Sequence, residues 1–170
     1  AGLGKTTIAK ALYNQLYHNF EAKCFLSNIK QTSNQPNALI HLQQQLLSSI
    51  TKSTNINLEN VDRGIAVLQE RLRRKKLLLI LDDVDEISQL NAIARSREWF
   101  GSGSRIIITT RDRHLLNQLE VDGLCSIDEM NDAEALELFS WHAFRNSYPS
   151  ETFHPLSKLV VDYCKGLPLA

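Results

Sequence analysis

The sequence predicts an α/β fold with a mainly parallel sheet. Stretches with apolar residues at helical spacing alternate along the chain with short runs rich in leucine or β-branched residues. Two of these runs, 77–81 and 105–109, are continuously apolar, which is typical of strands buried on both faces. From Asp132 onward only helical patterns follow. We therefore expect a sheet-containing core over residues 1–130 and the start of a helical domain over residues 131–170.

The first half of the chain is expected to hold three helices and one strand. Residues 6–18 place apolar side chains on one side of a helix, and residues 23–29 form a short apolar run. A polar, proline-containing stretch, 30–37, indicates a loop. Apolar residues recur at helical spacing over 38–51 and 61–74, which predicts two amphipathic helices.

The second half is expected to alternate between strands and helices before it becomes helical. The runs 77–81 and 105–109 predict two buried strands, and 124–127 predicts a weaker one. Helical spacing returns over 134–143 and 156–164.

Composition argues against several classes of partner. Of the 170 residues, 43% are hydrophobic, which is enough for one sizeable core. Nineteen basic residues balance nineteen acidic ones, so no overall field attracts the chain to nucleic acid or to an anionic membrane. The basic residues within 71–76 stand where a helix is expected to end, which favours a structural role. The longest apolar run is too short to span a bilayer, so we expect a soluble protein with no membrane partner.

Cysteine and histidine usage indicates no transition-metal site. The three cysteines, Cys24, Cys125 and Cys164, include no Cys-x-x-Cys pair, and the five histidines show no metal-binding spacing. The cysteines are interpreted as buried, reduced thiols in a cytosolic protein.

The first motif that carries chemistry is Gly4-Lys5-Thr6, the second half of the phosphate-loop pattern Gly-x-x-x-x-Gly-Lys-Ser/Thr. Backbone N–H groups around Gly2 and Gly4 would surround an anion, and the N-terminus of the following helix would favour it. Lys5 would bridge the β- and γ-phosphates, Thr6 would ligate Mg²⁺, and Thr7 would bond the α-phosphate. The motif predicts a site for ATP or ADP with Mg²⁺. The alternative is a glycine-rich helix start with a solvated lysine.

The second motif is the apolar run that ends in Asp82 and Asp83. A buried parallel strand delivers its C-terminal residues to the sheet edge where ligands bind. Asp82 would hold the Mg²⁺ shell, and Asp83 would orient or deprotonate the attacking water. The alternative is that Asp83 or Asp85 only caps the next helix.

The third motif is the run that ends in Thr110 and Arg111. If its strand neighbours that of Asp82, both residues lie beside the γ-phosphate, which an arginine reads in a bidentate manner. Arg111 would then distinguish ATP from ADP. In the alternative interpretation Arg111 pairs with a surface carboxylate and Asp112 caps the following helix.

The order of these motifs resembles one family, the nucleotide-binding NB-ARC domain of plant intracellular immune receptors with leucine-rich repeats (NBS-LRR proteins). Residues 4–7 are similar to its phosphate loop, 78–85 to its second kinase motif and 101–111 to its first sensor. Residues 135–144 are similar to its next motif, and 166–170 to its Gly-Leu-Pro-Leu motif. The resemblance covers the whole chain.

The resemblance implies a fold and a receptor class. The fold is that of a P-loop NTPase of the STAND/AAA-like type, and residues 131–170 correspond to the start of its helical ARC1 subdomain. Pro168 should pack against the adenine. Asp85 closes the second kinase motif, as is typical of receptors with an N-terminal Toll/interleukin-1 receptor (TIR) domain. The family's first strand would precede Ala1, so we expect a piece of a longer protein that lacks this strand.

The function that the resemblance implies is an ADP/ATP switch. ADP would hold a closed state, ATP would open the receptor for homo-oligomerisation, and at most slow Mg²⁺-dependent hydrolysis would reset it. The implied partners are the nucleotide and the TIR domain and leucine-rich repeats of the parent protein, in the cytoplasm, with the nucleus left open. Two other classes remain open: a metabolic or motor ATPase, and a transcription regulator with a related switch ATPase core.

Overall fold

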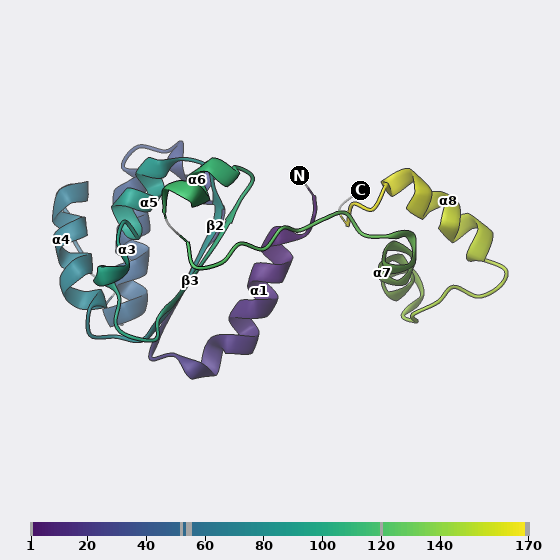
Figure 1. Ribbon diagram of the computed structural model, residues 1–170, viewed down its shortest axis with the longest axis horizontal. Coiled ribbons are helices and arrows are strands. Elements are labelled where there is room, and N and C mark those ends of the chain that lie inside the picture. Colours follow the sequence, from purple (N-terminus) through teal and green to yellow (C-terminus); the bar gives the residue numbers. More distant parts are fainter. Residues whose placement is uncertain (1, 52, 54–55, 120, 169–170) are drawn as a thin grey trace. The chain divides into compact units, whose positions relative to one another are not determined.

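The structure is a computed structural model that describes residues 2–51, 53, 56–119 and 121–168. It packs into two compact units (Figure 1). The sheet unit comprises Thr6–Asp122, and the helical unit comprises Ala1–Lys5 with Gly123–Ala170. The expected division of functional domains after residue 130 stays a prediction.

The sheet unit alternates helices with three strands. In chain order its elements are α1 (Lys5–Leu16, which begins at the last residue of the other unit), a 3-10 turn (Tyr17–Asn19), β1 (Ala22–Leu26), α2 (Ile29–Ser33), α3 (Ala38–Thr51), α4 (Val61–Leu72), β2 (Leu77–Val84), α5 (Ile87–Ile93), a second 3-10 turn (Arg97–Trp99), β3 (Arg105–Thr110) and α6 (Arg113–Gln118).

The three strands form a parallel sheet in the order β1-β2-β3, so the predicted α/β class is confirmed. The pairing of β2 with β3 is regular up to Leu81, which lies opposite Ile108, and resumes at Val84, which lies opposite Thr110. Two residues of β2 therefore lie opposite one residue of β3, which is the geometry of a β-bulge.

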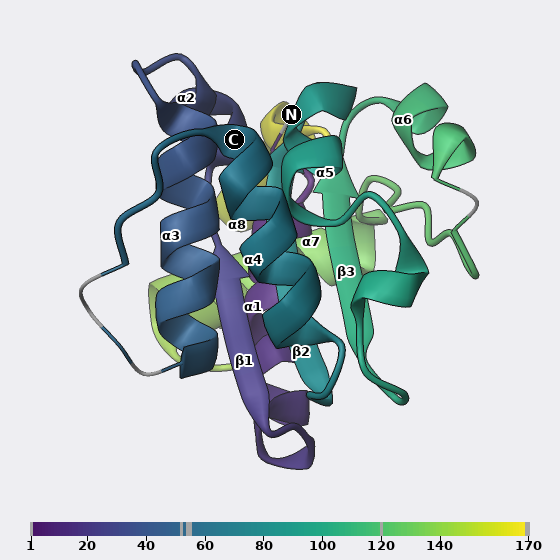
Figure 2. The same ribbon diagram turned by 90° about the vertical axis from the view of Figure 1, so that its left-hand side faces the viewer.

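Helices cover both faces of the sheet. Leu77, Leu79 and Leu81 pack in the larger core cluster with residues of α3, α4 and α5. Leu78 and Ile80 pack in a second cluster with residues of α1. Figure 2 shows α3 and α4 in front of the strands, with α1 behind them. The continuous apolar run of β2 is thus explained, because successive side chains enter two different cores.

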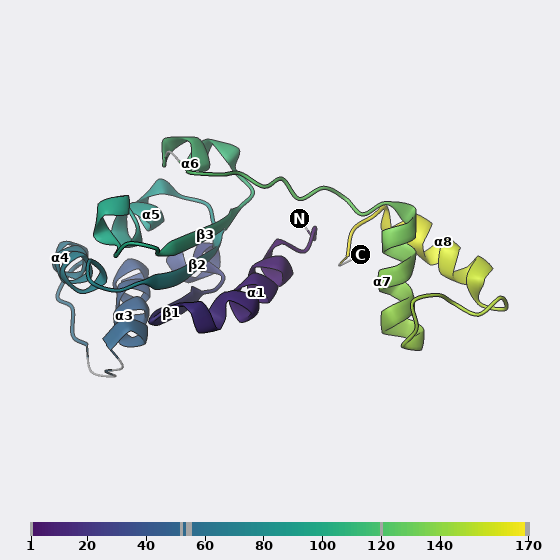
Figure 3. The same cartoon turned by 60° about the horizontal axis from the view of Figure 1, so that its bottom comes forward.

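The helical unit contains α7 (Asp132–Phe144) and α8 (His154–Cys164), which pack against each other (Figure 3). Asn131 and Glu134 form a capping box at the start of α7. The N–H of Met130 donates to the carbonyl of Gly166 at 3.0 Å, which ties the two ends of the helix pair together. Gly166 has φ 72°, and a Cβ there would lie 2.4 Å from the Met130 oxygen, so only glycine fits.

Three expectations from the sequence are wrong. Residues 124–127 form no strand, because they are mostly exposed and pair with no strand in the described part of the chain. The expected strand at 23–29 ends at Leu26, and α2 occupies the start of the expected loop, anchored by the buried side chain of Ile29. Cys125 is exposed rather than buried.

The first testable prediction concerns the thiols. Burial raises the pKa of Cys24 to about 11, against a weaker opposing effect of its hydrogen bond to Ser49. At about pH 8 its thiolate fraction is therefore roughly 100-fold below that of an ordinary thiol, and contact with the reagent is also blocked. Iodoacetamide followed by peptide mass spectrometry should modify Cys125 rapidly in the native protein and leave Cys24 intact. Equal labelling rates would contradict this placement.

Candidate functional site

The centre of the candidate site is the carboxylate of Asp82 at the end of β2. Its side chain is fully buried, with 0% exposure. The Thr6 hydroxyl, in the first turn of α1, donates to both carboxylate oxygens at 3.0 Å. The Thr109 hydroxyl of β3 donates to Oδ1 at 2.7 Å. Residues from three elements that are far apart in the sequence therefore meet at one buried carboxylate.

The surroundings of Asp82 suit a hard divalent cation. No Lys, Arg or His among the described residues forms an ion pair with this carboxylate, so its hydroxyl partners leave the charge without a cation. A buried charge without a counter-ion is costly. The hydroxyl of Thr6 and the carboxylate of Asp82 are oxygen ligands of the kind that Mg²⁺ accepts, usually one or two from the protein with water and phosphate completing the shell.

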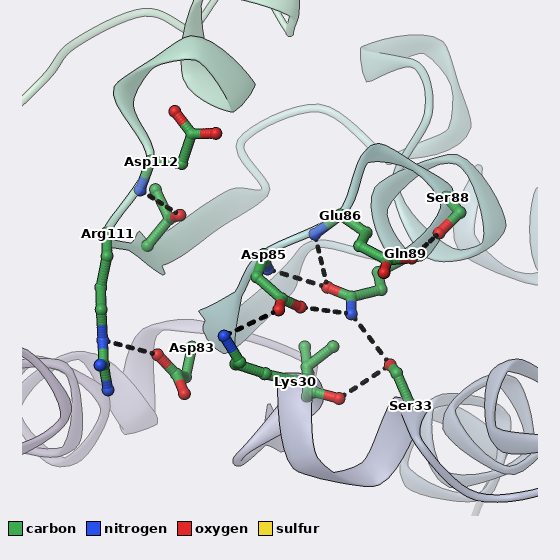
Figure 4. Close-up of polar contacts among 11 residues, drawn as sticks. Lys30, Ser33, Asp83, Asp85, Glu86, Ser88, Gln89, Arg111 and Asp112 are labelled. Carbon is green, nitrogen blue, oxygen red and sulfur yellow. Dashed lines mark hydrogen bonds and ion pairs between the residues drawn. The ribbon is translucent and has the colours of Figure 1, made fainter.

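Asp83 adopts an unusual backbone conformation within the bulge. Its φ is 57°, in the left-handed region that few non-glycine residues enter. Its N–H donates to the Thr109 hydroxyl at 2.9 Å. Its carboxylate lies 3.4 Å from Nε of Arg111, as Figure 4 shows. The N-cap of α5 is Glu86, which forms a capping box with Gln89. The alternative in which Asp83 or Asp85 caps this helix is therefore wrong.

The third motif lies beside the second, because β3 is the neighbour of β2. Arg111 pairs with Asp83, and the two side chains are 59% and 29% exposed. The Thr110 hydroxyl accepts the N–H of Asp112 at 3.0 Å, and Asp112 caps α6 by accepting the N–H of His114 at 2.8 Å. The alternative interpretation is thus seen here, with the difference that the carboxylate bound by Arg111 belongs to the candidate site. Recognition of phosphate by Thr110 and Arg111 stays a prediction.

The buried amide of Gln89 binds the segment that follows β2. Gln89 is 1% exposed and accepts the N–H groups of Asp85 and Glu86 at 3.0 and 3.2 Å. It donates to the Asp85 carboxylate at 2.8 Å and to the Ser33 hydroxyl at 3.0 Å. Lys30 of α2 pairs with Asp85 at 3.2 Å. Figure 4 shows how this network joins α2, β2 and α5.

The phosphate-loop residues belong mainly to the helical unit. Gly2 and Gly4 have φ 84° and 82°, values that glycine adopts without strain, as a loop that curls around an anion requires. A Cβ on Gly4 would lie 3.9 Å from Cγ of Pro168, so these two predicted site residues are close together. Lys5 begins α1 and is half-buried, and Thr7 is exposed.

Pro168 borders an apolar cavity of about 160 Å³ in the helical unit. Its walls come from α7, α8 and the segments at their ends: Met130, Ala135, Leu138, Phe139, His142, Val161, Cys164, Leu167 and Pro168. The proline ring is thus part of an apolar cavity wall, and its predicted packing against adenine stays a prediction.

The NB-ARC domain family model matches residues 1–148. The chain belongs to the NB-ARC domain family. This NB-ARC domain is 45% identical to disease resistance protein RPV1 and 46% identical to disease resistance protein RUN1, both of Vitis rotundifolia. It is 40% identical to TMV resistance protein N of Nicotiana glutinosa. Each alignment covers 99% of this chain but only 12%, 13% and 15% of the respective relative. The domain is therefore similar to a nucleotide-binding part of plant resistance proteins.

Two residues of this NB-ARC domain were not singled out by sequence reasoning. Thr109 precedes the two residues that the motif emphasises, and only the pairing of β3 with the bulge shows that it touches Asp82 and Asp83. Gln89 lies three residues beyond Glu86, a spacing that fits a capping box but does not reveal its burial. Within the described residues, no helix has the length and apolar character to cross a membrane.

The second testable prediction concerns Gln89. The substitution Gln89→Leu should lower the free energy of unfolding by about 2–4 kcal/mol, because it leaves the buried polar groups around Asp85 unsatisfied. The matched control is Ser88→Ala, which removes one exposed hydrogen bond to Glu86 and should cost no more than about 0.5 kcal/mol. Denaturant titration of both variants measures the difference. Equal midpoints would show that the amide network contributes nothing.

Proposed function

We propose that this domain is the ADP/ATP-binding switch of an intracellular plant immune receptor, reset by slow Mg²⁺-dependent hydrolysis of ATP. The observation that carries the proposal is the buried Asp82 carboxylate bonded to the Thr6 hydroxyl of the phosphate-loop helix. Membership of the NB-ARC family supports nucleotide binding, and the resistance proteins among its relatives support a role in defence.

The proposed roles in binding follow from the chemistry of each group. The N–H groups around Gly2 and Gly4 surround phosphate oxygens, and the Lys5 ammonium neutralises the β- and γ-phosphates. Thr7, which is exposed, bonds the α-phosphate. Pro168 packs against the adenine at the edge of its apolar cavity.

The proposed hydrolysis uses the carboxylates in separate roles. Asp83 takes a proton from a water molecule whose oxygen bonds to the γ-phosphorus, while the bond to the β,γ-bridging oxygen breaks and ADP leaves. Thr6 and Asp82 would hold Mg²⁺, which when bound neutralises charge on the β- and γ-phosphates. We propose that this hydrolysis is slow, so that the domain is at most a slow ATPase.

Arg111 is proposed to read the γ-phosphate, with Thr110 beside it. Its contact with Asp83 uses Nε. Among the described residues, its two terminal nitrogens form no hydrogen bond or ion pair. A guanidinium in this position keeps the four N–H groups of its two terminal nitrogens for a phosphate group while it holds Asp83. The pair is half-exposed, and such pairs contribute about 0–1 kcal/mol, so rearrangement on binding costs little.

The proposed switch is a shift of population between two states of the parent receptor. ADP favours a closed state, and ATP favours an open state that assembles with further copies. A shift from nearly all closed to nearly all open requires about a 10⁴-fold difference in affinity between the states. We further propose that the parent carries an N-terminal TIR domain and C-terminal leucine-rich repeats and acts in the cytoplasm.

A nucleic-acid-binding regulator is disfavoured by the zero net charge and by the internal contacts of two lysines in the basic run. Lys75 donates to the carbonyl of Ile50 at 2.7 Å, and Lys76 lies over the ring of Phe20 at 5.2 Å. These lysines serve contacts within the protein rather than forming a free basic patch. A metabolic or motor ATPase would turn over rapidly, whereas the proposed switch should co-purify with ADP.

The third testable prediction is that Lys5→Ala removes nucleotide retention. Loss of its charge-assisted bonds should weaken ADP binding by roughly 10- to 100-fold, since such bonds contribute about 1.5–3 kcal/mol. Chromatographic quantification of the nucleotide released from the purified full-length protein measures the effect. The matched control is Lys10→Ala, an exposed lysine on the same helix, which should retain ADP. Unchanged ADP content in the Lys5 variant would refute the site assignment.

The fourth testable prediction is that Arg111→Gln lowers affinity for ATP more than affinity for ADP. The charged side chain is proposed to contact only the phosphate that the two nucleotides do not share, so the ratio of the two dissociation constants should change by about tenfold. Competition binding with both nucleotides gives this ratio. Arg113→Gln, at an exposed position two residues further on, is the control and should leave the ratio unchanged.

A further inference from the structure

We infer that the hydroxyl of Thr109 is the positioning group that holds both carboxylate-bearing residues, Asp82 and Asp83, in the arrangement that hydrolysis requires. The inference rests on the proposed function for its catalytic meaning. Its structural basis is one hydroxyl that makes two hydrogen bonds, to the Asp82 carboxylate at 2.7 Å and from the Asp83 N–H at 2.9 Å.

The bulge creates the need for such a group. Asp82 and Asp83 together lie opposite Thr109, so the regular ladder of backbone bonds is interrupted there. The N–H of Asp83 then requires an acceptor other than a backbone carbonyl, and the Thr109 hydroxyl supplies it. This bond holds Asp83 in the left-handed conformation, which an aspartate does not adopt by default.

The two bonds are chemically compatible. A hydroxyl has one hydrogen and two lone pairs, so it can donate to Asp82 and accept from Asp83 at the same time. The bond to Asp82 is short because the acceptor is charged. The branched Cβ of threonine restricts χ1 and thus keeps the hydroxyl in place.

The position of Asp82 is therefore linked to that of Asp83. The carboxylate proposed to hold Mg²⁺ is bonded by Thr6 on one side and by Thr109 on the other. The Thr109 hydroxyl connects this carboxylate to the backbone N–H of Asp83, the proposed base. By contrast, the next hydroxyl, Thr110, accepts the N–H of Asp112 and contacts neither carboxylate.

The fifth testable prediction compares Thr109→Val, which keeps the shape and removes the hydroxyl, with Thr109→Ser, which keeps the hydroxyl. In the full-length protein, Thr109→Val should slow ATP hydrolysis by roughly 10- to 100-fold and raise the Mg²⁺ concentration for half-maximal activity, with ADP retained. Thr109→Ser should restore most of the rate and the Mg²⁺ dependence. A side chain with a purely structural role would not shift the Mg²⁺ dependence.

The control variant is Ser104→Ala, at the opposite end of the same strand pair. The Ser104 hydroxyl accepts the N–H of Leu77 in β2 at 3.0 Å and donates to the carbonyls of Gly101 and Lys75, so its removal costs both kinds of bond away from the carboxylates. It should lower stability without changing the Mg²⁺ dependence. If Thr109→Val does not fold, Thr109→Cys takes its place, because a thiol is a weaker donor of similar size.

Hydrogen exchange at the Asp83 amide tests the inference without nucleotide. Exchange in the nucleotide-free protein should be roughly tenfold faster in Thr109→Val than in the wild type, Thr109→Ser or Ser104→Ala, as expected for loss of one hydrogen bond. Unchanged exchange in Thr109→Val, or equal defects in Thr109→Ser and Thr109→Val, would overturn the inference. A wild type that binds no nucleotide would instead refute the proposed function, while the exchange rates still decide whether Thr109 holds Asp83.

Discussion

The interaction on which the rest of the site depends is the burial of the Asp82 carboxylate between two hydroxyls. A charge this far from water is tolerated only when its partners are fixed. The structure fixes them by delivering Thr6 from the first turn of α1 and Thr109 from β3 to the end of a strand whose two faces are covered by helices. The packing of the sheet therefore also sets the positions of the hydroxyls that bind Asp82.

The sequence predicts β2 and β3 and singles out candidate site residues whose roles stay predictions. The runs of β2 and β3 are recognisable because burial on both faces demands continuous apolar residues. Thr6, Asp82 and Asp83 are recognisable because phosphate and Mg²⁺ chemistry restricts residue types at fixed spacing. The bulge and the contacts of Thr109 cannot be recognised in the sequence, because they depend on the register between β2 and β3. The same holds for α2, whose polar sequence conceals one buried anchor, Ile29.

The site combines a rigid part with an adjustable one. Asp82 is buried and multiply bonded, so any rearrangement exposes or isolates a charge. Asp83 and Arg111 are paired near the surface, where the high dielectric of water keeps the contribution of such a pair to about 0–1 kcal/mol. In the proposed switch, this division lets the residues proposed to hold Mg²⁺ stay in place while Asp83 and Arg111 exchange partners.

The bulge also constrains how the length of β2 can change. With one residue more than β3 needs, deletion of Asp82 or Asp83 would restore a regular ladder and remove the left-handed residue. The backbone would become simpler, and one of the two adjacent carboxylates would be gone. At this edge, the more regular strand is the one without the paired acids, so a single-residue deletion that makes the sheet regular also removes a carboxylate of the candidate site.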